Sequence, residues 1–140
     1  MGLNRAFIWT PAEGLTDLGS LDGSSAVAIA INNRDEVVGL TSREGRSASF
    51  FWTRDRGMSL LALPERSSVR AIGNHGEIVY TRETLQGARA CILIGDREIA
   101  LPCYRGHQSE AAAINNRGDI VGHIWRGNHG HAVKWSRNNG

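Results

Sequence analysis

A segment of about twelve residues occurs three times in this chain, and no other feature restricts its fold so strongly. The copies are "AIAINNRDEVVG" at 28–39, "VRAIGNHGEIVY" at 69–80 and "AAAINNRGDIVG" at 111–122. Each copy has an apolar run, a polar turn and a second apolar run, which is the pattern of a β-hairpin. Recurrence of one unit every 40 residues or so is typical of a fold assembled from stacked copies of that unit.

A second marker recurs with the same period. The apolar segments are "AFIWT" at 6–10, "SFFWT" at 49–53, "ACILI" at 90–94 and "AVKWS" at 132–136. The two markers together divide the chain into repeats at about 5–45, 46–87 and 88–130, with a partial repeat at 131–140. We therefore expect a single repeat domain over 1–140, with three full repeats and one extra strand.

Each repeat predicts about four short strands. The polar centre of the third copy contains Asn115, Asn116 and Gly118, residues that favour tight turns. Gly76 holds the equivalent place in the second copy and Asp35 in the first, so this position is expected to adopt a left-handed backbone conformation. No segment of useful length has helical periodicity. The sequence therefore predicts an all-β fold.

Four-stranded repeats of this length favour a β-propeller-like architecture. A β-trefoil or a β-prism-like three-fold domain is the alternative, because three units of four strands also make a closed domain of this size. Three repeats are fewer than the ~4 to 8 blades that close a propeller. A homodimer that completes a six-bladed ring would solve this problem, since the strand at 132–136 duplicates the one at 6–10. The other interpretations are a fragment of a longer protein and a monomeric three-fold domain.

The pattern "RAFIWTPAEGLTDLGSL" followed by "AVAIAINNRDEVVG" resembles the HAF repeat family, whose His-Ala-Phe stretch here reads Arg5-Ala6-Phe7 and later His131-Ala132-Val133. The resemblance covers almost the whole chain and implies a propeller-like repeat protein. Members of this family are mostly uncharacterised and often expected to be extracellular. The sequence departs from the family pattern where the third copy lacks its Trp and where the start lacks an export signal. The chain as given therefore indicates a cytoplasmic protein or a part excised from an exported one.

Motifs for known chemistry are missing from the sequence. It has no Gly-x-Ser-x-Gly elbow, phosphate-binding loop or dinucleotide fingerprint. The recurring carboxylates Asp35, Glu36, Glu77 and Asp119 fall in the hairpin turns, where turn formation and solvation explain them. We name no catalytic residue, expect no cofactor, and favour a non-catalytic module over an enzyme. A small hydrolase or lyase with a site between repeats remains the alternative.

Metal and disulfide sites receive little support. His129 and His131 have the spacing that places two imidazoles on one face of a strand, and His123 would have to supply a third ligand. Isolated surface histidines explain the same pattern, and we predict no metal site. Cys91 and Cys103 flank a hairpin and lie near cross-strand register. We expect reduced, partly buried thiols rather than a disulfide.

The expected ligand-binding residues are Trp125, Arg126, Arg43 and Arg82. Trp9, Trp52 and Trp135 occupy equivalent places and are expected to pack between repeats, whereas Trp125 has no counterpart. The arginines fall in segments that join each hairpin to the next Trp strand, so a ring would gather them on one rim. Arginine binds carboxylates through forked hydrogen bonds and stacks on rings, and the same segments are also explained as variable surface loops.

These observations predict a binding or interaction module with a glycan or a protein as its ligand. A structural fragment of a longer repeat protein is a further alternative. The net charge of +2 gives no argument for a nucleic-acid partner. The sequence has no apolar run of the ~20 residues that a membrane helix needs, so we expect no membrane partner.

Overall fold

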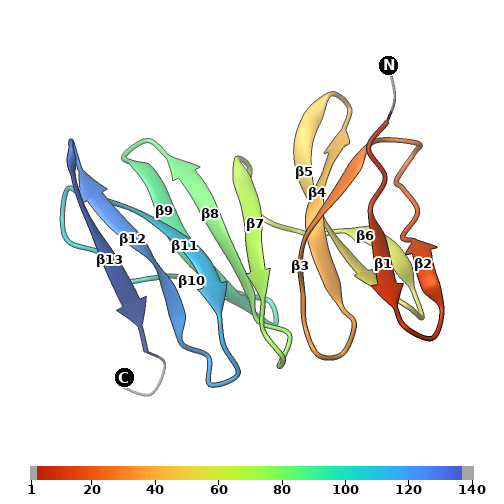
Figure 1. Ribbon diagram of the computed structural model, residues 1–140. Helices are drawn as coiled ribbons and strands as arrows, with labels where there is room; N and C mark the ends of the chain where they lie inside the picture. The colour runs from red at the N-terminus through yellow and green to blue at the C-terminus, as the bar shows by residue number, and fades with distance from the viewer. Residues whose placement is uncertain (1–2, 137–140) are drawn as a thin grey trace.

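The computed structural model describes residues 3–136, apart from the side chain of Arg43. The described residues form β-strands and turns and contain no helix (Figure 1), which confirms the all-β prediction. The strands are β1 (Phe7–Thr10), β2 (Gly14–Asp17), β3 (Ala26–Ile31), β4 (Val37–Arg43), β5 (Arg46–Thr53), β6 (Gly57–Leu60), β7 (Ser67–Ile72), β8 (Ile78–Thr84), β9 (Gly87–Ile94), β10 (Arg97–Ala100), β11 (Gln108–Ile114), β12 (Ile120–Arg126) and β13 (His129–Trp135).

The strands form four antiparallel sheets, none of them closed. Their strand orders are β1-β2, β3-β4-β5-β6, β7-β8-β9-β10 and β11-β12-β13. The sheets lie side by side along the molecule (Figure 1), with β3 against β7 and β7 against β11. The two middle sheets have four strands, whereas the first has two and the last has three. Closure into a propeller, a trefoil or a prism stays a prediction.

Each repeated twelve-residue segment is a hairpin, formed by β3-β4, β7-β8 and β11-β12. The first strand of each hairpin has a register shift at the same place, between Ala28 and Ala30, between Val69 and Ala71, and between Ala111 and Ala113. Such a bulge increases the local twist of a strand. The residue expected to adopt the left-handed conformation does so in all three hairpins, with φ of 59° at Asp35, 85° at Gly76 and 83° at Gly118.

The segments that join each hairpin to the next Trp strand were expected to be connecting loops, and this expectation is wrong. In the structure β4, β8 and β12 continue through them and pair with β5, β9 and β13 up to short turns. Glu44 and Gly45 form the first of these turns with positive φ at both residues, as the twist of a two-residue hairpin requires. The predicted boundary at 45/46 falls in this turn, so the β3–β6 sheet draws its strands from two successive repeats. Residues 137–140 of the predicted partial repeat lie outside the described residues.

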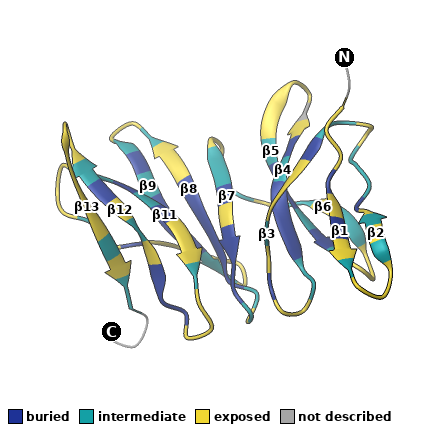
Figure 2. Ribbon diagram, in the orientation of Figure 1, coloured by how far each residue is buried: buried dark blue, intermediate teal, exposed yellow. Residues whose placement is uncertain are grey.

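The core consists of apolar side chains held between neighbouring sheets. One cluster, which includes Ile8, Phe50 and Trp52, lies between the β1-β2 sheet and the β3–β6 sheet. The next cluster joins the β3–β6 and β7–β10 sheets through Val38, Val69, Ile72 and Ile78. A third, with Val79, Ile92 and Ile120, joins the β7–β10 and β11–β13 sheets. Figure 2 shows buried residues along the middle sheets and mostly exposed ones along β13.

Candidate interaction surfaces

Arg43, Arg82 and Arg126 lie near the ends of three long hairpins, which turn at the same end of the molecule, the top in Figure 1. The cross-strand partners are basic in every case. Arg82 lies opposite Arg89, Arg126 opposite His129, and the backbone of Arg43 opposite Arg46. The side chain of Arg43 lies outside the described residues. Like charges directly opposite each other across a ladder destabilise a sheet, so the pairing of Arg82 with Arg89 has a cost.

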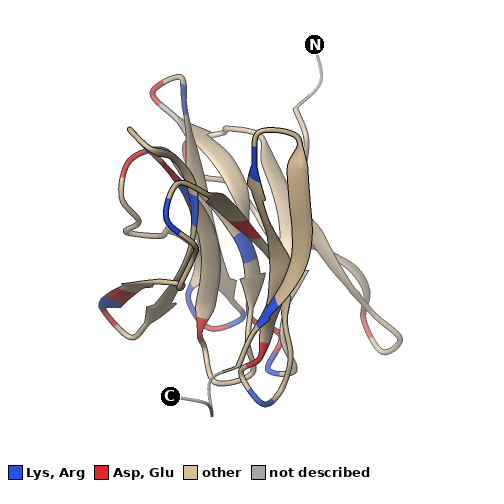
Figure 3. Ribbon diagram, turned by 90° about the vertical axis from the view of Figure 1, so that its left-hand side faces the viewer, with Lys and Arg blue, Asp and Glu red and all other residues tan. Residues whose placement is uncertain are grey.

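The described arginines at this end have no acidic partner. Arg46, Arg82 and Arg126 are exposed, and within the described residues none of them forms an ion pair. The opposite end differs, because Arg54 there lies 3.3 Å from Asp35 and Arg34 lies 3.0 Å from Glu36. Figure 3 shows charged residues at the turns of both ends. The hairpin ends also carry the exposed carboxylates Glu44 and Glu83, but basic residues outnumber them, and we call this surface the basic rim.

Trp125 lies on β12 and is half-buried. Its ring stacks on the imidazole of His123, with centroids 4.9 Å apart and planes at 24°. Successive side chains of a strand point to opposite faces. The structure therefore places Trp125 on the face of the β11–β13 sheet that carries His123, and Arg126 on the other face. The backbones of the four expected site residues lie toward one end of the molecule, and the side chains of Trp125 and Arg126 lie on opposite faces of their sheet.

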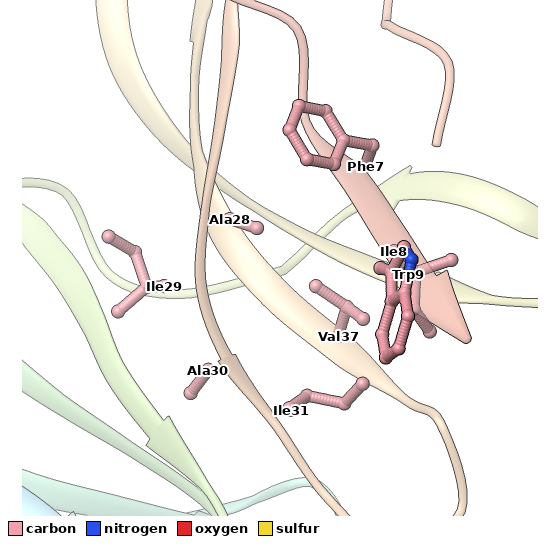
Figure 4. A pocket seen from close by; sticks show the side chains of 8 residues that line it. All are labelled: Phe7, Ile8, Trp9, Ala28, Ile29, Ala30, Ile31 and Val37. Carbon is pink, nitrogen blue, oxygen red and sulfur yellow. The ribbon is translucent and has the colours of Figure 1, made fainter. Parts of the chain in front are cut away.

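An apolar face remains open at the N-terminal end of the stack of sheets. It consists of Phe7 and Trp9 on β1 and of Ala28 and Ile31 on β3, which surround a shallow depression of about 300 Å³ (Figure 4). The equivalent residues of the following sheets are covered by a preceding sheet. Trp9 is 63% exposed, whereas Trp52 is 6% exposed. We call this surface the N-terminal open face.

A second open face lies at the C-terminal end of the stack. Ala112, Val121, His123, Ala132 and Lys134 surround an open depression of about 580 Å³ on the outer side of β11, β12 and β13. Val121 is 44% exposed, whereas Val38 and Val79 at the equivalent places are fully buried. We call this surface the C-terminal open face. The sequence prediction missed both faces, although the end copies of a stacked repeat generally have a neighbour on one side only.

The repeated tryptophans pack as expected where a neighbouring sheet is present. Trp52 belongs to the first core cluster, and Trp135 packs against the third and donates a hydrogen bond from Nε1 to the carbonyl oxygen of Pro102 (2.7 Å). Trp9 departs from the expectation because no sheet covers its side of β1 in the described part of the chain. Its exposure is a consequence of its place in the stack and not of its residue type.

The recurring carboxylates are held in the hairpin turns. Glu36 Oε1 accepts a hydrogen bond from Asn32 (2.7 Å), and Glu77 Oε1 accepts one from the backbone N–H of His75 (3.0 Å). Asp119 lies 3.5 Å from Arg117 in the third turn. These contacts stabilise the turns, as the sequence indicated. The expected solvation is wrong for Glu77 and Asp119, which are buried.

The three histidines do not converge. Residues opposite each other in an antiparallel pair share a face. His123 lies opposite Ala132, whereas His131 lies opposite Ile124, so His123 and His131 are on opposite faces of the sheet. The idea that His123 adds a third ligand to His129 and His131 is therefore wrong. No group of three metal-binding side chains occurs among the described residues.

The cysteines are free in the structure. Cys91 is buried on β9 opposite Ala100, and Cys103 is half-buried beyond β10. Burial raises the pKa of the Cys91 thiol. Burial also raises the pKa of Tyr80, the cross-strand neighbour of Cys91, and its hydroxyl donates a hydrogen bond to Glu98 Oε1 (2.5 Å). Both groups are therefore held in their protonated forms.

No protein-family model matches the chain, and no curated protein has a significantly similar sequence. The described residues contain no helix with the length and apolar character needed to cross a membrane.

Proposed function

We propose that this protein is a non-catalytic binding module built from HAF-like β repeats in a propeller-like arrangement, and that its basic rim binds an acidic ligand, a carbohydrate or a protein segment. The observation that carries this proposal is the opposition of two basic residues at the end of each long hairpin. Two arginines that face each other, as Arg82 and Arg89 do, destabilise the free protein, and a bound anion removes that cost.

The chemistry of the rim suits carboxylate or sulfate groups. Guanidinium groups form forked hydrogen bonds with such anions. Arg82 and Arg126 lie on adjacent sheets and carry no internal ion pair within the described residues, so both are available to a ligand. An extended acidic chain would contact several hairpin ends at once. Each exposed ion pair is weak, but several of them formed together raise the affinity of the chain for the protein.

The test measures binding of three probes by calorimetry: a poly-glutamate peptide, a sulfated oligosaccharide and a neutral oligosaccharide of the same length. The proposal expects binding of one or both acidic probes, weakened by added salt, and none of the neutral probe. Replacing Arg46, Arg82 and Arg126 with Ser should weaken binding by about tenfold, because each exposed charge contributes a fraction of the 1.4 kcal/mol that tenfold represents.

The matched control for the single rim variant Arg82→Ser is Arg56→Ser, which removes one exposed arginine from the β5-β6 turn at the opposite end. It should bind the acidic probe as the parent does. Equal weakening by the control would show that net charge and not the rim determines binding. Failure of both acidic probes to bind would overturn the proposed ligand class.

A further inference from the structure

The two open faces are the two sides of one recurring interface. Ile31 is 51% exposed on the N-terminal open face, whereas Ile72 at the equivalent place is 5% exposed because the β3–β6 sheet covers it. The exposed Val121 corresponds in the same way to Val38 and Val79, which the next sheet covers. Inside the molecule, each surface equivalent to an open face is covered by a neighbouring sheet. The N-terminal open face matches the side of this contact that is covered by the preceding sheet, and the C-terminal open face matches the side that does the covering.

The strand β1 also has a free edge. It is equivalent to β5 and β9, which lie between two strands of their sheets, whereas β1 pairs with β2 alone. By that equivalence, the neighbour missing from β1 is a strand of the β4, β8 and β12 kind. It would belong to a hairpin that also covers Ala28 and Ile31 on β3.

In the structure, the outer edge of β12 is occupied by β13. Val121 lies opposite Lys134, and Gly122 lies opposite Val133. Because β13 repeats the sequence of β1, the same register on β12 would place Ile8 opposite Val121 and Phe7 opposite Gly122. The strands β1 and β13 are therefore competitors for one edge. β13 forms seven cross-strand pairs with β12, and β1, which has four residues, reaches that length when residues 3–6 extend it.

The side chains of β1 fit that edge better than those of β13 do. In the β3–β6 sheet Gly39 lies opposite Phe50, whose ring occupies the space beside the glycine, and in the next sheet Tyr80 lies opposite Cys91. Each of these pairs combines one large and one small residue, whereas Gly122 and Val133 are both small. Phe7 opposite Gly122 would restore the glycine–phenylalanine pair.

The next position favours β1 more strongly. Lys134 on β13 is equivalent to Phe51 on β5, Ile92 on β9 and Ile8 on β1. The three apolar residues pack in the core clusters. A following sheet would bury this position. Burying an unpaired ammonium group is costly, whereas burying isoleucine is favourable. Lys134 is therefore compatible with an exposed β13 and not with a strand inside the stack.

We propose that the occupant of the N-terminal open face is the β11-β12 hairpin of a second copy of this chain, which pairs with β1 and releases its own β13. The exchange forms a complete four-stranded sheet, β11-β12 from one copy and β1-β2 from the other. Such exchange replaces the ladder hydrogen bonds of β13 with bonds of the same kind to β1, so it has a low cost. Burial of Phe7, Trp9, Ile31 and Val121 stabilises it.

The number of copies follows from the number of sheets. One chain contributes three four-stranded units, which is below the ~4 to 8 that form a closed ring. Two chains joined reciprocally contribute six, within that range, and three chains contribute nine, above it. Each copy contacts the N-terminal open face of the other through its β11-β12 hairpin. These two equivalent contacts close the ring and give a two-fold symmetric dimer. The basic rims of both copies then lie on the same end of the ring.

Engineered disulfides distinguish the two pairings of β12. In a Cys91→Ala, Cys103→Ser background, His123→Cys with Ala6→Cys should form a covalent dimer under oxidised glutathione, since the exchanged register places these residues opposite each other. In one molecule they lie on opposite end sheets of the stack (Figure 1). The matched pair His123→Cys with Ala132→Cys, which are opposite each other in the structure, should lock β13 in place and give a covalently closed monomer.

The parent chain provides a measurement that does not depend on the cysteine variants. Its mass in solution at tens of micromolar should be that of two chains of 15.2 kDa. Trp9→Asp should raise the dimer dissociation constant by at least about tenfold, because a buried aromatic residue often dominates an interface. Leu85→Asp, at a β8-β9 turn residue that is 98% exposed, is the control and should leave the dimer intact.

A monomeric parent overturns the proposal. So does a dimer in which the Ala6→Cys pair forms no intermolecular disulfide, or one that persists when β13 is locked. A negative result for the dimer does not contradict the proposed binding of an acidic ligand to the basic rim, since binding of the acidic probes is measured separately.

Discussion

The backbone N–H of Asn33 donates a hydrogen bond of 2.7 Å to Oδ1 of Asn74, the residue at the equivalent place in the next hairpin. Asn74 in turn donates from Nδ2 to Oδ1 of Asn116 in the third hairpin. The sequence predicts a turn within a single hairpin for Asn116. The structure shows that these three asparagines also connect the turns of neighbouring sheets, as a ladder across three successive hairpins.

Removing the centre of this ladder should destabilise the protein without altering any single hairpin. Asn74→Ala loses an acceptor and a donor and should lower the free energy of unfolding by about 1–2 kcal/mol, the usual range for two exposed hydrogen bonds. Asn74→Asp at pH 7, where the carboxyl is ionised, keeps the acceptor for Asn33 and loses the donor to Asn116, so its loss should be intermediate. Urea denaturation measures both. Equal stability of parent and Asn74→Ala would show that the ladder contributes nothing.

Two substitutions at the left-handed position of the hairpin turn should have different effects on the free energy of unfolding. Gly118→Val should lower the free energy of unfolding by at least about 1–2 kcal/mol, since a β-branched side chain strains a residue at positive φ. Asp35→Gly relieves the same strain but loses an exposed contact to Arg54, so it should change stability by less than about 0.5 kcal/mol. Thermal melts compare the two. A Gly118→Val variant that melts like the parent would contradict the register of the third hairpin.

Gly39 should tolerate no side chain. A Cβ there would overlap the carbonyl oxygen of Val27 and the ring of Phe50, whereas a Cβ at Gly130 would meet its nearest atoms at 3.7 Å. Gly39→Ala should therefore cost about 1–3 kcal/mol, the usual range for overpacking, and Gly130→Ala should be neutral or slightly stabilising. Chemical denaturation measures both, and a neutral Gly39→Ala variant would mean that Phe50 moves aside without loss.

The protein should lose stability in alkaline solution through Cys91 and Tyr80. Both groups have a folded-state pKa above the ordinary value, so the folded state keeps protons that the unfolded state releases. Their contribution is complete below the unfolded pKa values, about 8.5 for Cys and about 10 for Tyr, and is lost as the pH rises above them. Urea denaturation at pH 7 and pH 10.5 should show this loss.

Tyr80→Phe should reduce the pH dependence between these two values while lowering stability at pH 7 by about 1 kcal/mol, through the lost hydrogen bond to Glu98. Tyr104→Phe, at an exposed tyrosine, is the control and should follow the parent at both pH values. An unchanged pH dependence in Tyr80→Phe would show that the phenol does not contribute.

The sequence by itself determined the strand class and the chemistry of the turns. Asp35, Gly76 and Gly118 were recognisable because positive φ restricts the residue type at that position, whatever surrounds it. The apolar runs on both sides of each polar turn likewise identified the hairpins, since that pattern depends only on local sequence. The long extensions of β4, β8 and β12 were missed because their side chains are polar and variable, which is also the composition of loops.

Only the tertiary structure decided which of the repeated residues are covered. Ile31 and Ile72 have the same residue type and the same place in their hairpins, yet one is exposed and the other is buried. The same holds for Trp9 and Trp52. Burial of a strand residue depends on which sheet lies over it, and the edge that a strand pairs with depends on contacts between segments far apart in the chain. No periodicity within one repeat contains that information.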